Sequence, residues 1–301
     1  MTLHRIVAAL GGDLYSGGLR ASVPGPGHSA SDRSVSLLLS GDRLVAHSFG
    51  SSDWRAVRDQ LVRAGLIDHA GRLISGPVPM RSETPPRPDR ACRIAAARRL
   101  WAAAQPVSPA CLSRRHLDRR GIRQDAATLP ALRHHPCAPL AAYRGGGGGV
   151  PALVAAIRHP DGALVAAELT YLAPNGERDR RLRVSRKTVG AVPPGSAVRL
   201  QPPASTMLVG EGVMTSLSGG DRFGLPAWAL LSANNLAAWS PPIGVERVLI
   251  AADRGAGGQS AARQLQLRLR QLRLDVAVTT PPEPFDDWNA VAVAESRKEG
   301  G

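Results

Sequence analysis

In the last third of the chain, short apolar runs alternate with segments whose apolar residues recur at helical spacing. The apolar runs lie at 206–210, 228–232, 247–252 and 275–279. The helical patterns lie at 213–218, 236–239, 259–274 and 287–297. Strands that alternate with helices are typical of a mainly parallel sheet with helices on both faces. The pattern therefore predicts an α/β unit over 204–301.

The preceding region has a different pattern, in which apolar runs are separated by tight-turn sequences. Pro160-Asp161-Gly162 and Pro174-Asn175-Gly176 are such turns, and turn residues of this kind between apolar runs favour β-hairpins. The sequence predicts an antiparallel, β-rich basic subdomain over 146–203. Its expected strands lie at 152–158, 163–171, 178–184 and 197–200.

Two helices are predicted ahead of this subdomain, at 91–104 and at about 110–120. Both are rich in arginine. A run of this kind forms either a solvated surface or a surface that binds nucleic acid, and the sequence leaves both interpretations open. We describe residues 91–145 as a basic helical segment.

The N-terminal residues, 1–69, alternate short β-like pieces with turns. A hairpin is predicted at 34–39 and 43–49, and a helix is predicted to start near Trp54. Residues 70–90 are rich in proline and poor in core-forming residues. Their composition is typical of a linker.

The charge is strongly positive, and its distribution is more informative than its size. The chain has 38 Lys+Arg and 24 Asp+Glu, a formal net charge of +14. Residues 204–301 hold 9 basic and 10 acidic residues, so the whole excess lies ahead of them. A basic front part favours a polyanionic partner such as nucleic acid, whereas the acidic end is suited to a cation.

The cysteine positions and the apolar stretches bear on whether the protein has disulfides, binds zinc or spans a membrane. The three cysteines, Cys92, Cys111 and Cys137, lie far apart, so they predict neither a disulfide framework nor a zinc site. No apolar stretch approaches the length that spans a bilayer, and no signal-peptide pattern opens the chain. We therefore expect a soluble cytoplasmic protein without a membrane partner.

Two acidic residues follow apolar runs of the C-terminal unit. Glu211 comes directly after the first run, between two glycines, and Asp253 comes after the third. Open α/β sheets place their chemistry at the carboxyl ends of their strands. Because carboxylates are the ligands that Mg²⁺ prefers, these two acids predict a divalent-metal site.

The order of these elements, with Glu211, Asp253 and the pair Asp286-Asp287, resembles the Toprim domain of primase-like proteins of phages and plasmids. The resemblance implies an α/β fold with a Rossmann-like sheet. It also implies that Glu211 and Asp253 bind Mg²⁺ or Mn²⁺ and that Asp287 supports catalysis of nucleotidyl transfer.

The sequence departs from the family pattern at two positions. Gly255 replaces the second acid of an Asp-x-Asp motif, and Ala290 replaces an acid after Asp287-Trp288-Asn289. Arg254 adds a positive charge beside Asp253. Two interpretations follow: a centre that holds one ion weakly, with Arg254 contacting substrate phosphate, or a fold retained without activity.

The resemblance extends, more faintly, into the front part of the chain. His116 to Ile122, Leu132 to Pro136, Leu169 to Gly176 and Lys187 to Gly190 are similar to family segments. By that resemblance, Arg183, Arg186 and Lys187 are candidates for contacts with phosphates of DNA or nucleotides; the alternative is a solvated β-ribbon.

The N-terminal region is similar to the family's zinc ribbon, but it lacks the cysteines. Gly25, Ser48 and Ser52 occupy the cysteine positions, and His28 is the ligand that remains. A structural zinc site needs four ligands, so we expect no zinc.

Three functions are consistent with these observations. The first is a primase-like nucleotidyltransferase that acts on single-stranded DNA with nucleotides, in plasmid or phage replication, beside a separately encoded replicative helicase. The second is a catalytically inactive DNA-binding accessory of a replication system. The third is a Toprim nuclease, in which water attacks the phosphate instead.

Overall fold

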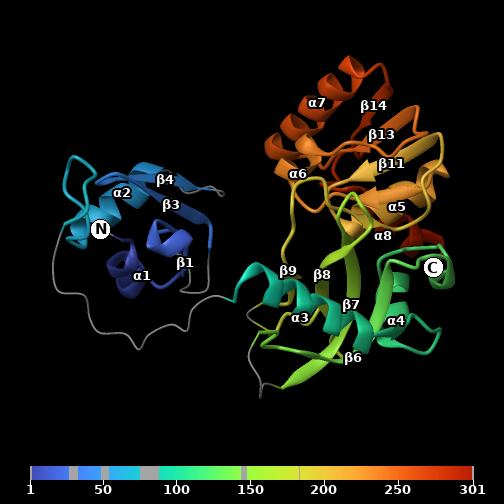
Figure 1. Ribbon diagram of the computed structural model, residues 1–301, viewed down its shortest axis with the longest axis horizontal. Helices are drawn as coiled ribbons and strands as arrows, with labels where there is room; N and C mark the ends of the chain where they lie inside the picture. Colours follow the sequence, from blue (N-terminus) through green and yellow to red (C-terminus); the bar gives the residue numbers. More distant parts are fainter. Residues whose placement is uncertain are drawn as a thin grey trace. The chain divides into compact units, whose positions relative to one another are not determined.

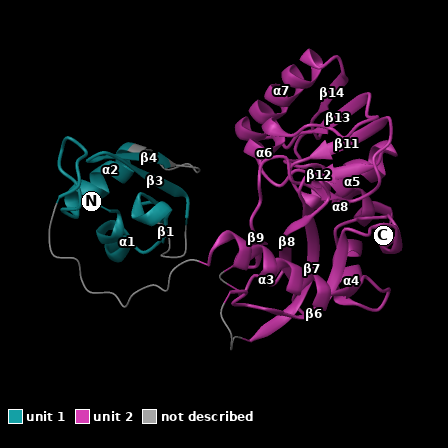
Figure 2. Ribbon diagram, viewed as in Figure 1, with its two compact units in different colours: residues 1–86 teal, residues 87–301 magenta. Residues whose placement is uncertain are grey.

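A computed structural model describes residues 2–26, 33–48, 54–74, 88–143, 148–182 and 184–299. The chain forms two compact units, residues 1–86 and 87–301 (Figure 2). Each unit has its own hydrophobic core. The boundary falls within the stretch expected to be a linker, of which residues 75–87 lie outside the described part.

The first unit is an antiparallel sheet of four strands with two helices (Figure 1). Its elements are α1 (His4–Leu10), β1 (Asp13–Tyr15), the 3-10 helix η1 (Ser16–Gly18), β2 (Arg20–Val23), β3 (Val35–Ser40), β4 (Arg43–Ser48) and α2 (Trp54–Arg63). The predicted hairpin and helix are confirmed, since β3 pairs with β4 and α2 begins at Trp54. His28 and Ser52, from the zinc-ribbon comparison, lie outside the described residues.

Alternation along β3 determines which face of this sheet is covered. Val35, Leu37 and Leu39 are buried, whereas the residues between them are more exposed. The buried face packs against Ile6 of α1 and Leu61 of α2. The opposite face is left to solvent, as expected for an antiparallel sheet covered on one side.

The second unit contains two sheets, and the first of them is antiparallel with the strand order β5-β6-β7-β8-β9. Its elements are α3 (Arg90–Ala103), β5 (Gln105–Pro106), α4 (Leu112–Arg119), η2 (Ala126–Thr128), β6 (Leu132–Pro139), β7 (Gly149–Arg158), β8 (Leu164–Tyr171) and β9 (Arg186–Gly190). The two predicted helices and the two predicted strands of the central hairpin are confirmed. The strand β6 was not predicted, because it lies in the segment expected to be helical.

One predicted strand of this sheet is wrong. Residues 178–184 were expected to form it, but the strand that pairs with β8 is β9, at Arg186–Gly190. The reason is local. The side chain of Asp179 is buried and accepts hydrogen bonds from the backbone N–H and guanidinium of Arg181, and Leu182 N donates to Asp179 O at 3.3 Å. These bonds hold a turn that is incompatible with a ladder.

The second sheet of this unit has the strand order β10-β12-β11-β13-β14, and all its pairs are parallel except β10 with β12. Its elements are β10 (Val198–Arg199), β11 (Thr206–Gly210), α5 (Val213–Phe223), β12 (Ala227–Ala229), α6 (Ala233–Ala238), β13 (Arg247–Ala251), α7 (Ala256–Gln271), β14 (Asp275–Thr279) and α8 (Trp288–Glu299). The predicted α/β order is confirmed.

Helices cover both faces of this mainly parallel sheet. Met207 and Val209 of β11 pack in one core with residues of α6 and α7. Leu208, between them, packs in another core with residues of α5 and α8. Because successive side chains of a strand point to opposite faces, β11 is buried on both sides, which explains its continuous apolar sequence.

The core on the α5 and α8 side also includes residues of the antiparallel sheet. Leu153 and Val165 belong to it together with Leu217 and Trp288. In Figure 1, α5 and α8 lie between the two sheets of the unit. The two sheets of residues 87–301 therefore share one continuous apolar core.

A search of the described helices for a possible membrane span finds none that is sufficiently long and apolar.

Candidate active site

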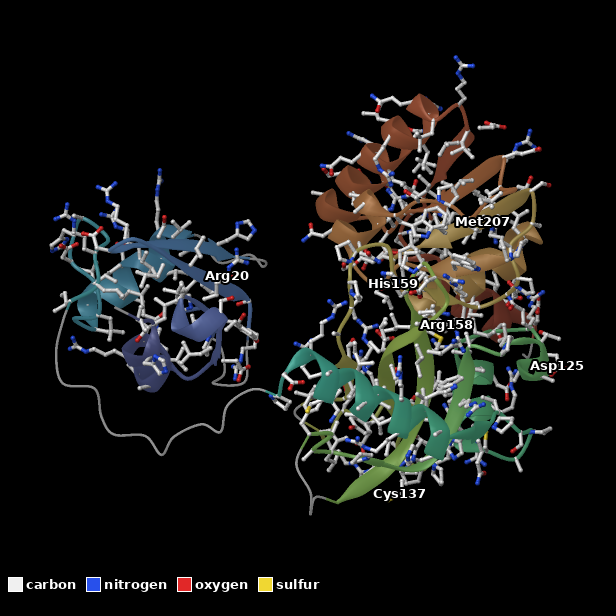
Figure 3. All side chains as sticks on the ribbon, in the orientation of Figure 1. Arg20, Asp125, Cys137, Arg158, His159 and Met207 are labelled. Carbon is white, nitrogen blue, oxygen red and sulfur yellow. The ribbon has the colours of Figure 1, made fainter. Side chains whose placement is uncertain are left out.

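Glu211 and Asp253 leave the same edge of the parallel sheet. Gly210 pairs in register with Ala251, the last residue of β13, so the residues that follow both strands emerge side by side. Met207, which Figure 3 labels, lies on the strand that leads to Glu211. The expectation that these two acids come together at strand ends therefore agrees with the register.

The carboxylate of Asp253 interacts with the two other candidate acids. Burial, together with the nearby charges of Asp287 and Glu211, raises the pKa of Asp253 from 3.8 to about 6, whereas a hydrogen bond from Thr215 opposes the shift. That bond runs from Thr215 Oγ1 to Asp253 Oδ1, at 3.3 Å. Burial also raises the pKa of Glu211, and the charge of Arg186 opposes this. Asp253 is thus repelled by two other acids in a partly buried place, an arrangement that a cation relieves.

Asp287 also has a structural role at the start of α8. Its Oδ1 accepts a hydrogen bond from the N–H of Ala290 at 2.6 Å, so it caps the helix. Asn289, two residues further on, is buried. Its Nδ2 donates to Arg120 O at 2.7 Å and to Ser218 Oγ at 2.9 Å. Asn289 therefore ties α8 to the end of α4 and to α5.

We expect Asn289→Ala to lower the free energy of unfolding by about 2–3 kcal/mol, because it leaves two buried acceptors without their donor. Urea denaturation measures the change. The matched control is Asn234→Ala on the exposed side of α6, which should cost less than about 0.5 kcal/mol. An equal loss of unfolding free energy in the two variants would contradict the stabilising role described for the hydrogen bonds of Asn289.

A cavity of about 460 Å³ adjoins Asp287. Its walls come from α4, β7, β8, β9, α5, α8 and the turn after β8. Six arginines line it, together with three acids and His116. The arginines are Arg119, Arg120, Arg178, Arg180, Arg186 and Arg297, and the acids are Glu168, Glu177 and Asp287. The strong excess of positive charge suits a polyanion.

Arg186 and Lys187 lie on opposite faces of the antiparallel sheet. Arg186 pairs with Thr170 of β8, and both line the cavity. Lys187 pairs with Leu169 on the other face, where its Nζ donates to Leu140 O at 2.7 Å and lies 5.1 Å from the ring centre of Tyr171. Burial lowers the pKa of Lys187. Alternation therefore places Arg186, but not Lys187, at the cavity, and contact of either residue with phosphate stays a prediction.

Arg120 is a partly buried arginine of the cavity wall, and its charge interacts with that of Asp287. Burial lowers the pKa of Arg120, and the neighbouring Arg178 and Arg186 act in the same direction, whereas Asp287 opposes them. Its buried Nε has no hydrogen-bond partner in the described part of the chain. A guanidinium with an unused donor beside an acid, in a cavity, is suited to an anionic ligand such as phosphate.

The structure gives Arg254 a different role from the expected one. Its guanidinium donates to Pro281 O at 2.5 Å and to Phe285 O at 3.3 Å, and forms an ion pair with Glu283 at 3.2 Å. These contacts fix the segment before α8, and contact between Arg254 and substrate phosphate stays a prediction. Arg183, the remaining candidate, lies outside the described residues.

Gly255 occupies open space at the start of α7. Its φ of −137° is in the extended region, and a Cβ placed on it would meet no atom within 4 Å. An L-residue with a side chain is therefore tolerated there. Neither crowding nor backbone conformation requires a glycine at the position where the family pattern has an acid.

The donor types fit Mg²⁺ or Mn²⁺, but the acids are not gathered into a ready coordination site. Hard carboxylate oxygens are the ligands these ions prefer. In the described residues, however, no group of three or more His, Cys, Asp or Glu side chains is placed to hold a metal ion. The arrangement therefore suits an ion that keeps several waters and takes part of its ligands from a substrate phosphate.

Sequence reasoning missed one residue of the cavity wall. Glu168 is an acid in the otherwise apolar strand β8, on the same face as Thr170. Burial raises the pKa of Glu168, and the charge of Arg186 opposes this shift. A single acid within an apolar run was the available signal, because such a residue is seldom buried without a partner.

Two family models match the chain. Residues 91–200 match a domain of unknown function (DUF7146), and residues 206–298 match the Toprim domain. The C-terminal part of the protein is therefore a Toprim domain. The resemblance seen in the sequence is confirmed for this part, whereas the phage or plasmid type stays a prediction. No curated protein matches the chain.

Among solved structures, the chain is similar to bacterial primases. The DnaG catalytic core has a TM-score of 0.48 at 15% identity, covering 69% of this chain and 79% of that one. The DnaG catalytic domain bound to single-stranded DNA has a TM-score of 0.47 at 15% identity, covering 70% and 79%. The zinc-binding and RNA polymerase domains of the Aquifex aeolicus primase have a TM-score of 0.45 at 14% identity, covering 95% and 78%.

Proposed function

We propose that this protein binds single-stranded DNA and nucleotides in the arginine-lined cavity and catalyses nucleotidyl transfer for primer synthesis. One observation carries the proposal: Asp287, whose charge acts on Asp253 of the Toprim domain, lies in the wall of a cavity that six arginines line. The proposed setting is replication in the cytoplasm, of plasmid or phage type, beside a separately encoded helicase.

The basic and the acidic residues of the site have different proposed roles. Arg120 and Arg186, which face the cavity from α4 and β9, would hold phosphates of the template strand or of the incoming nucleotide. Glu211 and Asp253 would hold Mg²⁺ or Mn²⁺, and Asp287 would keep their surroundings negative. When bound, such an ion neutralises phosphate charge and favours in-line attack by a hydroxyl group.

A second function is supported by a specific observation. Gly255 and Ala290 stand where the family pattern has acids, and no group of three metal-ligating side chains is preformed in the part that the structure describes. With two carboxylates fewer, the attraction for a dication is weaker. The alternative is therefore an inactive accessory that binds single-stranded DNA through the same arginines.

An assay of primer synthesis distinguishes the candidate functions. Purified protein is incubated with single-stranded template, ribonucleotides and Mg²⁺ or Mn²⁺, and the products are resolved by length. Short RNA products are expected. Binding of DNA without products would support the accessory, and nicking of the template would support a Toprim nuclease, the third possibility.

Arg186→Ala is expected to weaken binding of a single-stranded oligonucleotide about five- to tenfold and to reduce the slope of log K against log [salt] by about 0.7, the value for one lost contact with a single strand. Fluorescence anisotropy at several salt concentrations measures both quantities. The matched control is Arg263→Ala on the exposed side of α7, outside the cavity. If Arg263→Ala lost as much affinity for DNA as Arg186→Ala, the effect would come from net charge alone.

A further inference from the structure

A second cavity lies in the first unit, along the outer edge of its sheet. Its volume is about 420 Å³, and its walls come from β4, α2 and the segment 67–71. Six of its lining residues are apolar, and two of these, Leu61 and Ile67, are buried. Neither matched family model covers this unit, and the proposed function does not use the cavity.

The strand beside this cavity has an edge that is only partly paired. β4 is the last strand of its sheet. Leu44 N donates outward to Gly71 O at 2.9 Å, and Leu73 N donates to Asp42 O at 3.2 Å, so the segment 71–73 covers the first half of β4.

Within the described residues, the outer side of the edge is unpaired at Ala46. Ala46 lies two residues after Leu44, so its backbone N–H and C=O point to the same outer side. No hydrogen bond is recorded for these outward groups of Ala46 in the described residues. An exposed edge of this kind is a template for another extended chain.

The charges at the cavity have one sign. Arg43 and Arg58 line it, and none of the described lining residues is acidic. Two acids in the turns that flank the cavity, Asp42 and Asp68, already have partners within the unit. Asp42 forms an ion pair with Arg72 at 3.2 Å, and Asp68 accepts hydrogen bonds from the N–H groups of Ala70 and Arg72. An acidic ligand is therefore favoured over a basic one.

We propose that this edge binds an extended acidic segment of a partner protein, which adds a strand beside Ala46. In this arrangement, the segment exchanges backbone hydrogen bonds with Ala46, places one bulky apolar side chain in the cavity, and sets its carboxylates near Arg43 and Arg58. Addition of a strand at a free sheet edge, with a pocket for one side chain, is a general mode of peptide recognition.

Two other occupants fit this place less well. A nucleic acid has no amide ladder to pair with Ala46 and gains little from a cavity with apolar walls. A second copy of this chain, paired through β4, would bring no carboxylate from that strand to Arg43 and Arg58, because Arg43–Ser48 contains no acidic residue.

Peptide binding to the full-length protein tests the proposal. The probes are fluorescein-labelled ten-residue peptides of Val and Thr with one central Leu, Phe or Trp and two Glu. Matched peptides carry Lys in place of Glu. We expect saturable binding of at least one acidic peptide, followed by anisotropy, and binding at least about tenfold weaker for its lysine counterpart.

Variants locate the binding on the edge. Ala46→Pro removes the outward N–H, and proline is tolerated on an edge strand when its nitrogen faces outward. We expect both Ala46→Pro and Arg43→Glu to weaken peptide binding at least tenfold, whereas Arg20→Glu, an exposed arginine of β2 that Figure 3 labels, should change it less than twofold. Circular dichroism checks that each variant is folded. In the wild type, hydrogen exchange of the segment 43–48 should slow when the peptide is bound.

Several results would overturn the proposal. These are the absence of binding by every acidic peptide, equal weakening in Arg20→Glu, or displacement of the peptide by a single-stranded oligonucleotide but not by unlabelled peptide. Dimerisation that Ala46→Pro abolishes would assign the edge to a second copy instead. None of these results depends on primer synthesis, so the proposal and the proposed function can fail separately.

Discussion

Asp253→Asn is expected to reduce primer synthesis at least about a hundredfold and, at the same time, to stabilise the folded protein at pH 7. The loss follows because the variant removes a carboxylate proposed to hold the metal ion. The gain follows because the charged carboxylate is partly buried and repelled by Glu211 and Asp287. After allowance for solvent screening, the gain in the free energy of unfolding should be about 1 kcal/mol.

The pH dependence of stability gives a separate test of the same residue. The pKa of Asp253 is raised to about 6 from its ordinary value of 3.8, so between these values the folded state binds more protons than the unfolded state. This carboxyl group therefore makes the protein less stable as pH rises from about 4 to about 6. We expect Asp253→Asn to remove that slope, measured by thermal denaturation, and the exposed control Glu246→Gln to retain it. An unchanged slope in Asp253→Asn would contradict the repulsion described for this centre.

Gly255→Asp is expected to raise the affinity for Mn²⁺ at least tenfold and to increase any primer synthesis in proportion. The substitution restores an acid at the position where the family pattern has one. The open space around Gly255 and its extended φ allow a side chain without strain. An added carboxylate near Asp253 strengthens attraction for a dication, which prefers hard oxygen ligands. Isothermal titration calorimetry measures the affinity.

The control for this variant is Gly255→Asn. Gly255 is the N-cap of α7, and both aspartate and asparagine cap helices well, so the two substitutions should strengthen the start of α7 to a similar extent. Only aspartate adds a charge. Equal Mn²⁺ affinity in the two variants would show that position 255 is not a ligand position in this fold, and would favour the inactive accessory.

The sequence predicted those parts of the site that depend on position along a strand. Glu211 and Asp253 were found because each follows a continuous apolar run, and parallel register then brings the two ends together. The candidate role of Asp287 came from the family resemblance. Its charge acts on Asp253 in the structure, although its roles in catalysis and metal binding stay predictions.

The parts that depend on contacts between distant segments were not predictable in this way. Arg186 and Lys187 are adjacent, and only the pairing of β9 with β8 decides which one faces the cavity. Arg254 was interpreted from its neighbour Asp253, but the chain 30 residues later supplies its partners, among them Glu283. The cavity itself draws its walls from seven separate segments, so no single stretch of sequence contains it.

The apolar core shared by the two sheets of residues 87–301 limits how the protein can be dissected. A fragment that starts at residue 204 would retain the matched Toprim domain but would lose Leu153 and Val165, which pack with Leu217 and Trp288. Its newly exposed apolar surface would favour aggregation. The boundary of a sequence family is thus not a boundary of folding here, and a fragment that preserves this core should begin ahead of Val107, its first residue.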